Sequence, residues 1–305
     1  MAFVQHAIRG EEFLLGAQNL VGRAPHCTWR LSDARVSSEH ARIRWTGAGW
    51  EIKDLSSSNG TWVNGEQIKA GIAVGLPQGA LLSFGHNDQS WTLADVGPPA
   101  ACARNLSSGA VSTSVDGLIA VPSEDEPRLS ILEEGHDRWC LEDVNGKRSV
   151  EHGEVLVVDG ESWRLELATG PEPTWTRDLT TQRLGDYNLE LSVSSDEEHV
   201  EATLVRRNER VAAEPSVHYY ILLLLARRLL TDTQDDLSQA EQGWIYRDEL
   251  CDMLRTDPNK LNVDIYRVRR LFGKLGIQGA AGIIERRPTT RQLRVGLPRI
   301  KIVAL

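Results

Sequence analysis

Four short motifs in the first third of the chain combine side chains that suit a phosphate group. In chain order they are Gly22-Arg23, Ser37 to His40 (SSEH), Asp54 to Thr61 (DLSSSNGT) and Val63 to Gly65 (VNG). An arginine presents a planar fork of N–H donors that matches phosphate oxygens, and hydroxyl and backbone N–H groups complete the shell around a dianion. The motifs therefore predict an anion-binding site built from one guanidinium, several hydroxyls and an amide.

The elements that must position these motifs are short strands. Residues 1–95 alternate between apolar and polar side chains, with turn signals between the runs and no helical period, which is typical of a sandwich. The clearest expected strands are Phe13–Leu15, Ala41–Trp45, Trp50–Lys53, Thr61–Val63 and Ala80–Phe84. The motifs then lie in inter-strand loops, where binding groups collect on a rigid scaffold.

The order and spacing of the four motifs closely resemble the forkhead-associated (FHA) domain, a reader of phosphothreonine peptides, over residues 12–95. The resemblance implies that Arg23, Ser37 and Ser58 bind the phosphate. It also implies that Asn59 bonds the peptide backbone and that Ser38 touches phosphate or peptide. It assigns the remaining motif residues to the architecture of the loops: His40, Asp54, Gly60, Thr61, Asn64 and Gly65.

Two details of this site bear on specificity. Ser58 keeps the hydroxyl of the threonine often found at its position but lacks the methyl group, which could soften the choice between phosphothreonine and phosphoserine. The peptide sequence preference is expected to come from variable loops, here Arg35, Val36 and the segment Glu66 to Lys69.

The middle of the chain, between the linkers 97–100 (GPPA) and 170–173 (GPEP), weakly repeats the first domain. Residues 139–144 (WCLEDV) parallel residues 50–55 (WEIKDL), and residues 153–165 parallel residues 79–93. A second, degenerate FHA-like sandwich is one interpretation, and any small β-domain with alternating strands is the other. The positions of His40 and Asn59 fall at Leu129 and Arg148, and no Gly-Arg pair precedes them. This segment is therefore expected to lack the phosphate pocket and to have a structural or protein-contact role.

The last third changes to the 3.6-residue period of helices, predicted at His218–Leu230, Ile245–Leu254 and Asn259–Leu275, with two short strands at 283–286 and 292–295. From about Leu189 to Ile302 it resembles the winged-helix output domain of OmpR-like response regulators. The motifs that carry this resemblance are the apolar helix at 220–225 (YILLLL), YRDEL from Tyr246 and VRRL from Val268. Asp264 departs from the family, which usually has an apolar residue there.

The third helix is amphipathic, with Leu261, Ile265, Val268, Phe272 and Leu275 on its inward face. Arginine pairs with guanine, asparagine with adenine, and lysine with phosphate, so the other faces are typical of a helix that reads a DNA groove. Arg286, Arg287, Arg291 and Arg294 flank the expected wing. The candidate DNA-binding residues are Lys260, Asn262, Tyr266, Arg267, Arg270 and Arg291.

Charge is distributed unevenly along the 305 residues, whose formal net charge is −9. Residues 96–217 carry 11 basic and 24 acidic side chains, net −13, whereas residues 255–305 carry 12 and 3, net +9. The acidic middle could hold the basic segment away from DNA until a ligand arrives, or it could be a soluble spacer. An internal phosphothreonine is a further possibility, with Thr233, Thr176 and Thr180 as candidates.

Other function classes find little support. The four cysteines are far apart without metal-ligand spacing, and neither a phosphate-cradling Gly-Lys loop nor a nucleophile elbow is present, so no enzyme, cofactor or metal site is expected. The longest apolar run, Tyr219 to Ala226, is too short to span a membrane, and the N-terminus does not read as a signal peptide.

Together these patterns predict a bacterial, cytoplasmic, multidomain β plus α/β protein. The expected domains are an FHA β-sandwich at 1–96, a degenerate FHA-like β-domain at 104–170 and a winged helix-turn-helix at 183–305. The expected partners are a phosphothreonine-containing protein, either a Ser/Thr kinase or its substrate, and double-stranded DNA. The function would be phospho-dependent transcription regulation, and the alternative is a phospho-dependent scaffold or adaptor whose winged helix binds protein.

Overall fold

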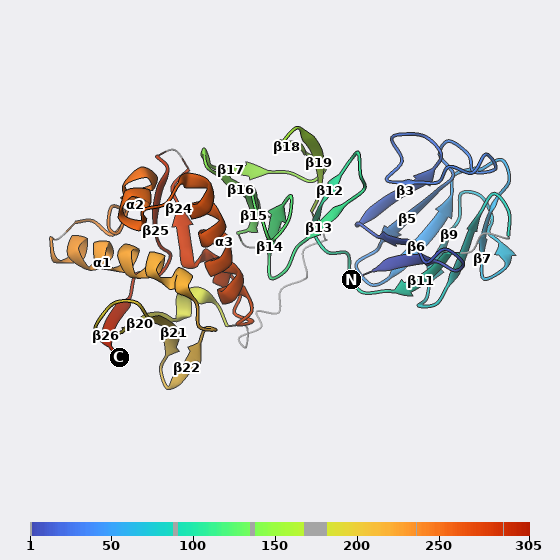
Figure 1. The fold of residues 1–305 in the computed structure, drawn as a ribbon. Helices are drawn as coiled ribbons and strands as arrows, with labels where there is room; N and C mark the ends of the chain where they lie inside the picture. Colours follow the sequence, from blue (N-terminus) through green and yellow to red (C-terminus); the bar gives the residue numbers. More distant parts are fainter. Residues whose placement is uncertain (1, 88–90, 135–137, 168–181, 236, 289) are drawn as a thin grey trace. The chain divides into compact units, whose positions relative to one another are not determined.

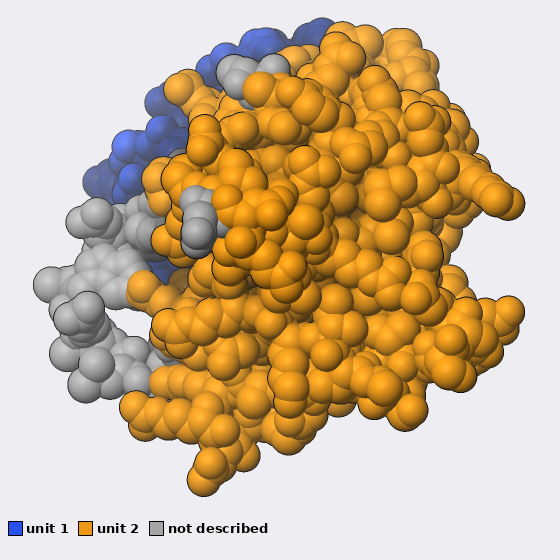
Figure 2. All heavy atoms as spheres, turned by 90° about the vertical axis from the view of Figure 1, so that its left-hand side faces the viewer, with its two compact units in different colours: residues 1–102, 166–173 blue, residues 103–165, 174–305 orange. Residues whose placement is uncertain are grey.

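The structure, a computed structural model, describes residues 2–87, 91–134, 138–167, 182–235, 237–288 and 290–305. The chain forms two compact units, residues 1–102 with 166–173 and residues 103–165 with 174–305 (Figure 2). The second expected linker, 170–173, and the candidate threonines Thr176 and Thr180 lie outside the described residues.

The first unit is a sandwich of two sheets (Figure 1). The six-stranded sheet has the order β2 (Glu12–Leu14), β1 (Phe3–His6), β11 (Trp91–Asp95), β10 (Leu81–Phe84), β7 (Thr61–Val63) and β8 (Glu66–Gln67). The five-stranded sheet has the order β4 (Trp29–Arg30), β3 (Gln18–Gly22), β5 (Ala41–Trp45), β6 (Trp50–Asp54) and β9 (Ala73–Leu76). Alternate residues of these strands form the shared core, including Val4, Ile43, Ile52, Leu82 and Leu93.

The five strands predicted for the first unit are confirmed, and their ends shift by at most one residue. The core arises from the period-2 alternation, because successive side chains of a strand point to opposite faces and one face is apolar. Strands β1 and β3 were not among the clearest sequence signals. They are short, and each places a polar residue in an inward position, His6 in β1 and Asn19 in β3.

The middle segment also contains two four-stranded antiparallel sheets. One has the order β13 (Val111–Thr113), β12 (Cys102–Asn105), β19 (Glu161–Glu166) and β18 (Val155–Val158). The other has the order β14 (Leu118–Val121), β15 (Leu129–Glu133), β16 (Trp139–Asp143) and β17 (Gly146–Val150).

The strand orders of these two sheets correspond to the strand orders of the first unit. The series β13-β12-β19-β18 follows β2-β1-β11-β10, and β14-β15-β16-β17 follows β3-β5-β6-β9. Even the first hairpin turn matches: the His6 ring accepts backbone N–H bonds from residues 8 and 9, and the Asn105 side chain accepts them from residues 107 and 108. The middle segment has no counterpart of the β7–β8 hairpin between β16 and β17, which pair directly through Asp143 and Gly146.

The C-terminal segment begins with a four-stranded sheet, in the order β22 (Glu209–Ala212), β21 (Val200–Arg206), β20 (Asn188–Val193) and β26 (Ile300–Ala304). Strand β26, which pairs parallel to β20, is not among the strands predicted from the sequence. A second sheet has the order β23 (Ile245–Tyr246), β25 (Gln292–Val295) and β24 (Ile284–Arg286).

Three helices pack with these sheets: α1 (Tyr220–Gln234), α2 (Arg247–Leu254) and α3 (Pro258–Gly273). The short 3-10 helices are η1 (Leu184–Asp186), η2 (Val217–Tyr219) and η3 (Ala280–Ile283). The predicted third helix is found as α3, which begins at Pro258, one residue before the predicted Asn259. The Asp257 side chain accepts N–H bonds from residues 259 and 260, and Pro258 takes the first turn. Its inward face is confirmed too: Leu261, Ile265, Val268 and Phe272 are buried, and Leu275 is partly buried.

Two expectations about this segment were wrong in detail. Residues Ile245 and Tyr246, expected within the second helix, form strand β23 before α2 begins. Thr233, one of the candidate internal phosphothreonines, lies in the last turn of α1, where its hydroxyl donates to the Leu229 carbonyl at 2.7 Å. A helical residue bonded in this way lacks the extended backbone of a peptide ligand.

Candidate functional site

The loops that carry the four motifs are joined to each other by hydrogen bonds. The backbone N–H groups of Arg23 and Ala24 donate to the Ser37 and Ser38 carbonyls, both at 3.0 Å. The backbone N–H of Ser58 donates to the Ser37 hydroxyl oxygen, also at 3.0 Å. The loop after β3, the loop before β5 and the loop after β6 therefore form one rim of the first unit.

Gly22 makes this close approach possible. A Cβ atom at this position would lie 2.2 Å from the Ser38 carbonyl oxygen and 2.8 Å from the Cys27 sulfur. Any side chain would therefore push the two loops apart and move Arg23, which explains in physical terms why glycine precedes the arginine.

Arg23 is exposed at this rim and oriented by a single bond, from Nε to the Val36 carbonyl at 3.3 Å. Within the described residues no carboxylate pairs with it, so its terminal nitrogens remain available. Ser38, Ser58 and Asn59 are exposed and Ser37 is half-buried. The structure thus brings all five predicted phosphopeptide residues to the same set of loops.

His40 is fully buried and connects two of these loops. Its Nδ1 accepts the Ser37 backbone N–H at 3.0 Å, and its Nε2 lies 2.9 Å from the Gly60 carbonyl, to which it donates. Burial lowers the pKa of His40, outweighing the Gly60 carbonyl and Asp54, which act to raise it. A neutral ring with its proton on Nε2 satisfies both bonds, in agreement with the predicted bracing role.

Asp54 organises the loop that presents Ser58 and Asn59. Its carboxylate accepts the hydroxyls of Ser57 and Thr61, both at 2.6 Å, and the Ser57 backbone N–H at 3.0 Å. Burial acts to raise the pKa of Asp54, and these three hydrogen bonds more than compensate and lower it. The Asn59 amide nitrogen donates to the Arg35 carbonyl at 2.8 Å, which ties this loop to the one before β5.

The expected specificity residues are only partly placed to meet a ligand. Val36 is 2% exposed and contributes its carbonyl to Arg23, so its side chain does not line the rim. Arg35 is exposed but is held by a two-pronged ion pair with Asp33, at 2.7 and 3.0 Å. Sequence reasoning missed Asp33, which no motif marks, although its spacing of two residues from Arg35 allows the pair.

The candidate DNA-binding residues fall into two groups. Lys260, Arg267 and Arg291 are exposed. Lys260 and Arg267 pair with Asp264, at 3.1 and 3.8 Å, and the same carboxylate lies 3.1 Å from His218. Asp264 is therefore the centre of a local charge network, and the inward face of α3 is as predicted.

The other three candidates do not form the free polar face that was expected. Tyr266 is 2% exposed and packs against Leu118, Ala120 and Leu132 of the middle segment. Arg270 pairs with two middle-segment carboxylates, Asp116 at 3.2 Å and Glu124 at 3.6 Å. Asn262 accepts a hydrogen bond from Arg286 at 2.8 Å. Periodicity could show only that these residues avoid the core of their own domain.

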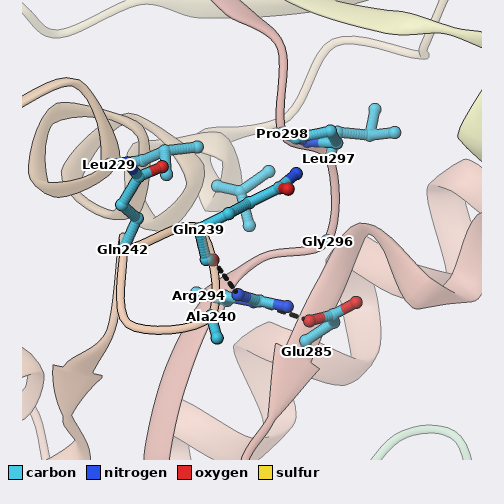
Figure 3. Close-up of a pocket in the computed structure, with 10 residues that line it drawn as sticks. Leu229, Gln239, Ala240, Gln242, Glu285, Arg294, Gly296, Leu297 and Pro298 are labelled. Carbon is cyan, nitrogen blue, oxygen red and sulfur yellow. Dashed lines mark hydrogen bonds and ion pairs between the residues drawn. The ribbon is translucent and has the colours of Figure 1, made fainter. Parts of the chain in front are cut away.

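Three of the four arginines that flank the expected wing, Arg286, Arg287 and Arg294, are likewise engaged within the protein, whereas Arg291 is exposed. Arg287 and Arg294 lie over the Trp244 ring, at 4.9 and 4.4 Å from its centroid. Arg294 also reaches Glu285 at 2.7 Å and the Gln239 carbonyl at 3.3 Å, at the edge of a cavity of about 410 Å³ (Figure 3). Arg294, the cation among the described residues that line this cavity, is therefore neutralised by Glu285, which gives no basis for an anion site there.

No helix of the described ranges is long and apolar enough to cross a membrane. Over the same ranges no group of three metal-ligating side chains forms a metal site. The four cysteines are all buried free thiols.

Comparison with known proteins concerns the first unit. A family model for the FHA domain matches residues 19–85. The FHA domain-containing protein FhaB of Mycolicibacterium smegmatis is 36% identical over 86 residues, covering 28% of this chain and 54% of FhaB. FhaB of Mycobacterium tuberculosis is 34% identical over 86 residues, which cover the same fractions of this chain and of FhaB. This chain thus spans about half the length of these curated relatives.

Among solved structures, Mycobacterium tuberculosis EmbR in complex with a low-affinity phosphopeptide is 34% identical, over 30% of this chain and 23% of EmbR, with a TM-score of 0.28. A structure from work on phosphothreonine-dependent FHA domain interactions is 30% identical, over 30% of this chain and 92% of its own, with a TM-score of 0.27. The family match and the curated relatives establish an FHA domain in the N-terminal unit.

Proposed function

We propose that this protein captures phosphothreonine-containing segments of a Ser/Thr kinase or its substrate through its FHA domain, and that capture regulates DNA binding by the C-terminal segment. The observation that carries the first part is the rim around Arg23. The Arg23 guanidinium, which pairs with no carboxylate of the described residues, stands there beside the hydroxyl-bearing residues Ser37 and Ser58, on loops fixed by buried His40 and Asp54.

The chemistry of this rim favours a dianion. A phosphate can receive two charge-assisted bonds from the free nitrogens of Arg23, together with hydroxyl and backbone N–H donors. Asn59, already at the rim, can meet the peptide backbone beside the phosphate.

Titration of the full chain with matched phosphorylated and unphosphorylated threonine peptides tests this proposal. Arg23→Ala should weaken phosphopeptide binding by roughly 100-fold, the equivalent of two charge-assisted hydrogen bonds at about 1.5 kcal/mol each. Arg9→Ala is the control, since Arg9 is an exposed arginine of the same unit that pairs only at 3.8 Å with Glu11. Unchanged capture by Arg23→Ala would overturn the proposal.

DNA binding is supported by the order of elements α1, β23, α2, α3, β24 and β25, which is the order of a winged helix. The exposed cations Lys260 and Arg267 on α3 and Arg291 at the β24–β25 turn could contact phosphates or bases. Arg267→Glu combined with Arg291→Glu should abolish DNA binding and leave phosphopeptide binding unchanged. DNA affinity of the unaltered chain should fall steeply with salt, and salt-independent binding would count against this part.

A scaffold or adaptor is the second candidate function. The observation that favours it is the packing of Tyr266 and Arg270 against the middle segment, since it shows this face of α3 engaged with protein. A scaffold would be indifferent to DNA and to the Arg267/Arg291 charge reversal.

A further inference from the structure

We infer that the middle segment is a releasable mask over α3, which must separate from the helix before the C-terminal segment can bind DNA. This inference rests on the DNA binding proposed above. Its basis is the face of α3 that carries Asn262, Tyr266, Arg269 and Arg270, beside β14 (Figure 1).

The first contact is a small apolar cluster. Tyr266 packs with Leu118 and Ala120 of β14, Leu132 of β15 and Ala281 of η3, separately from the large C-terminal core. The approach is close, because a Cβ atom on Gly273 would lie 2.9 Å from the Cβ of Asp116. The α3 surface in contact here would otherwise face solvent or a ligand.

The second contact is electrostatic. Glu142 of β16 is 5% exposed and pairs with Arg269 at 2.9 Å and Arg286 at 3.3 Å. Arg286 also donates to the Asp143 carbonyl at 2.7 Å, and Arg247 donates to the Val144 carbonyl. At the C-terminal end of the helix, Asp116 and Glu124 flank Arg270.

These carboxylates occupy positions that DNA phosphates would need. Carboxylate and phosphate are alternative partners for the same guanidinium fork, so an arginine bound to one cannot give its full set of bonds to the other. Residues 104–166 carry 14 acidic and 6 basic side chains, which also opposes the approach of a polyanion. The mask therefore competes by direct occupation and by repulsion.

Some buried polar atoms at this interface also lack hydrogen-bond partners, which is compatible with two surfaces that can separate. Within the described residues, the buried Asn262 Nδ2 and Arg269 Nε atoms have no hydrogen-bond partner. Each such atom costs free energy in the closed state and regains water when the surfaces part. By contrast, the carboxylate of Asp54 in the FHA domain accepts three hydrogen bonds.

The test uses the full chain with Asp116→Asn combined with Glu124→Arg, which removes the two carboxylates that face Arg270. Asn is chosen because Asp116 has a φ of 55°, which asparagine tolerates. The matched control is Asp159→Asn combined with Glu151→Arg. It makes the same charge change at exposed positions of the same segment, and Asp159 also has a positive φ of 50°.

The expected result is DNA binding at least about 10-fold tighter for the Asp116/Glu124 variant, with the control within about twofold of the unaltered chain. Amide hydrogen exchange of residues 258–273 should increase in the variant only. Equal tightening in both variants would attribute the effect to overall charge and overturn the mask. Equal DNA binding by the unaltered chain and the variant would overturn it while leaving the DNA-binding proposal intact. Faster exchange with no DNA binding in any form would refute both.

Discussion

The two sheets of the FHA domain and the two sheets of the middle segment share their strand orders, but they differ in which surface is buried. In the FHA domain the outer face of β5 and β6 is charged, with Arg42 opposite Lys53 and Arg44 opposite Glu51. In the middle segment the corresponding pairs are Ser130 with Glu142 and Leu132 with Cys140, all of which are buried. Strands β14 and β15 are buried along nearly their whole length, whereas β5 and β6 alternate.

The connecting loops show the reverse contrast, because the loop after β6 is long and the loop after β16 is short. The FHA domain inserts residues 55–72 between β6 and β9, and this insertion carries Ser58, Asn59 and the β7–β8 hairpin. The middle segment joins β16 to β17 through residues 144 and 145 alone. The same strand order thus presents a long hydrogen-bonded loop in the first unit and a buried sheet face in the middle segment.

The largest expected effect is a difference in stability loss between mutations at matching positions of β16 and β6. Glu142→Ala leaves two buried guanidinium groups without their carboxylate and should destabilise the second unit by about 3–5 kcal/mol. Lys53→Ala, at the matching position of β6, should change stability by less than about 0.5 kcal/mol. Urea unfolding with hydrogen exchange of each unit measures both, and similar losses would contradict the contrast in burial.

A smaller effect is expected from the two aspartates that end β6 and β16. Asp54→Ala leaves the Ser57 and Thr61 hydroxyls unpaired and should cost about 2–3 kcal/mol and weaken phosphopeptide binding. Asp143 accepts only the backbone N–H groups and side-chain amide of its turn, at 2.7 to 3.3 Å, so Asp143→Ala should leave peptide binding unchanged. Loss of peptide binding in Asp143→Ala would show that the loops are not independent.

The pH dependence of the FHA domain provides a further test. Because burial lowers the pKa of His40 below its unfolded value of about 6.5, its contribution to stability is complete above that value and is lost as pH falls through the folded pKa. Protonation at Nδ1 would also break the bond from the Ser37 N–H. Urea unfolding between pH 7.5 and 5 should show a loss of stability that His40→Gln lacks. The same pH dependence of stability in the unaltered chain and in His40→Gln would contradict this role of neutral His40.

The smallest effect concerns Ser58. Ser58→Thr adds one methyl group, worth about 0.8 kcal/mol if buried against the ligand, and should raise the preference for phosphothreonine over phosphoserine peptides by roughly threefold to fourfold. Paired titrations of the two peptides give this ratio. Lys147→Thr, at the position matched to Ser58 by sequence in the middle segment, should create no phosphopeptide binding, since Lys147 lies in strand β17.

Local sequence determined much of this protein. The motifs around Arg23 were enough to place the FHA loops, because glycine, asparagine and hydroxyl residues at fixed spacing encode turns and hydrogen bonds within a few residues. The 3.6-residue period likewise located α3 to within two residues at each end and identified its inward face. The runs Leu118–Val121 and Leu129–Leu132 held an unused signal, since strands that are apolar on both faces must be covered on both.

What covers those strands was decided only by tertiary structure. The environments of Tyr266, Arg269, Arg270 and Arg286 depend on side chains about 130 to 155 residues away in sequence. The parallel pairing of β26 with β20 also joins distant segments, although their separation in sequence is shorter. An amphipathic pattern states which face of a helix leaves its own core. Whether that face then meets water, DNA or another part of the chain depends on the complementarity of whole surfaces, which no local window contains.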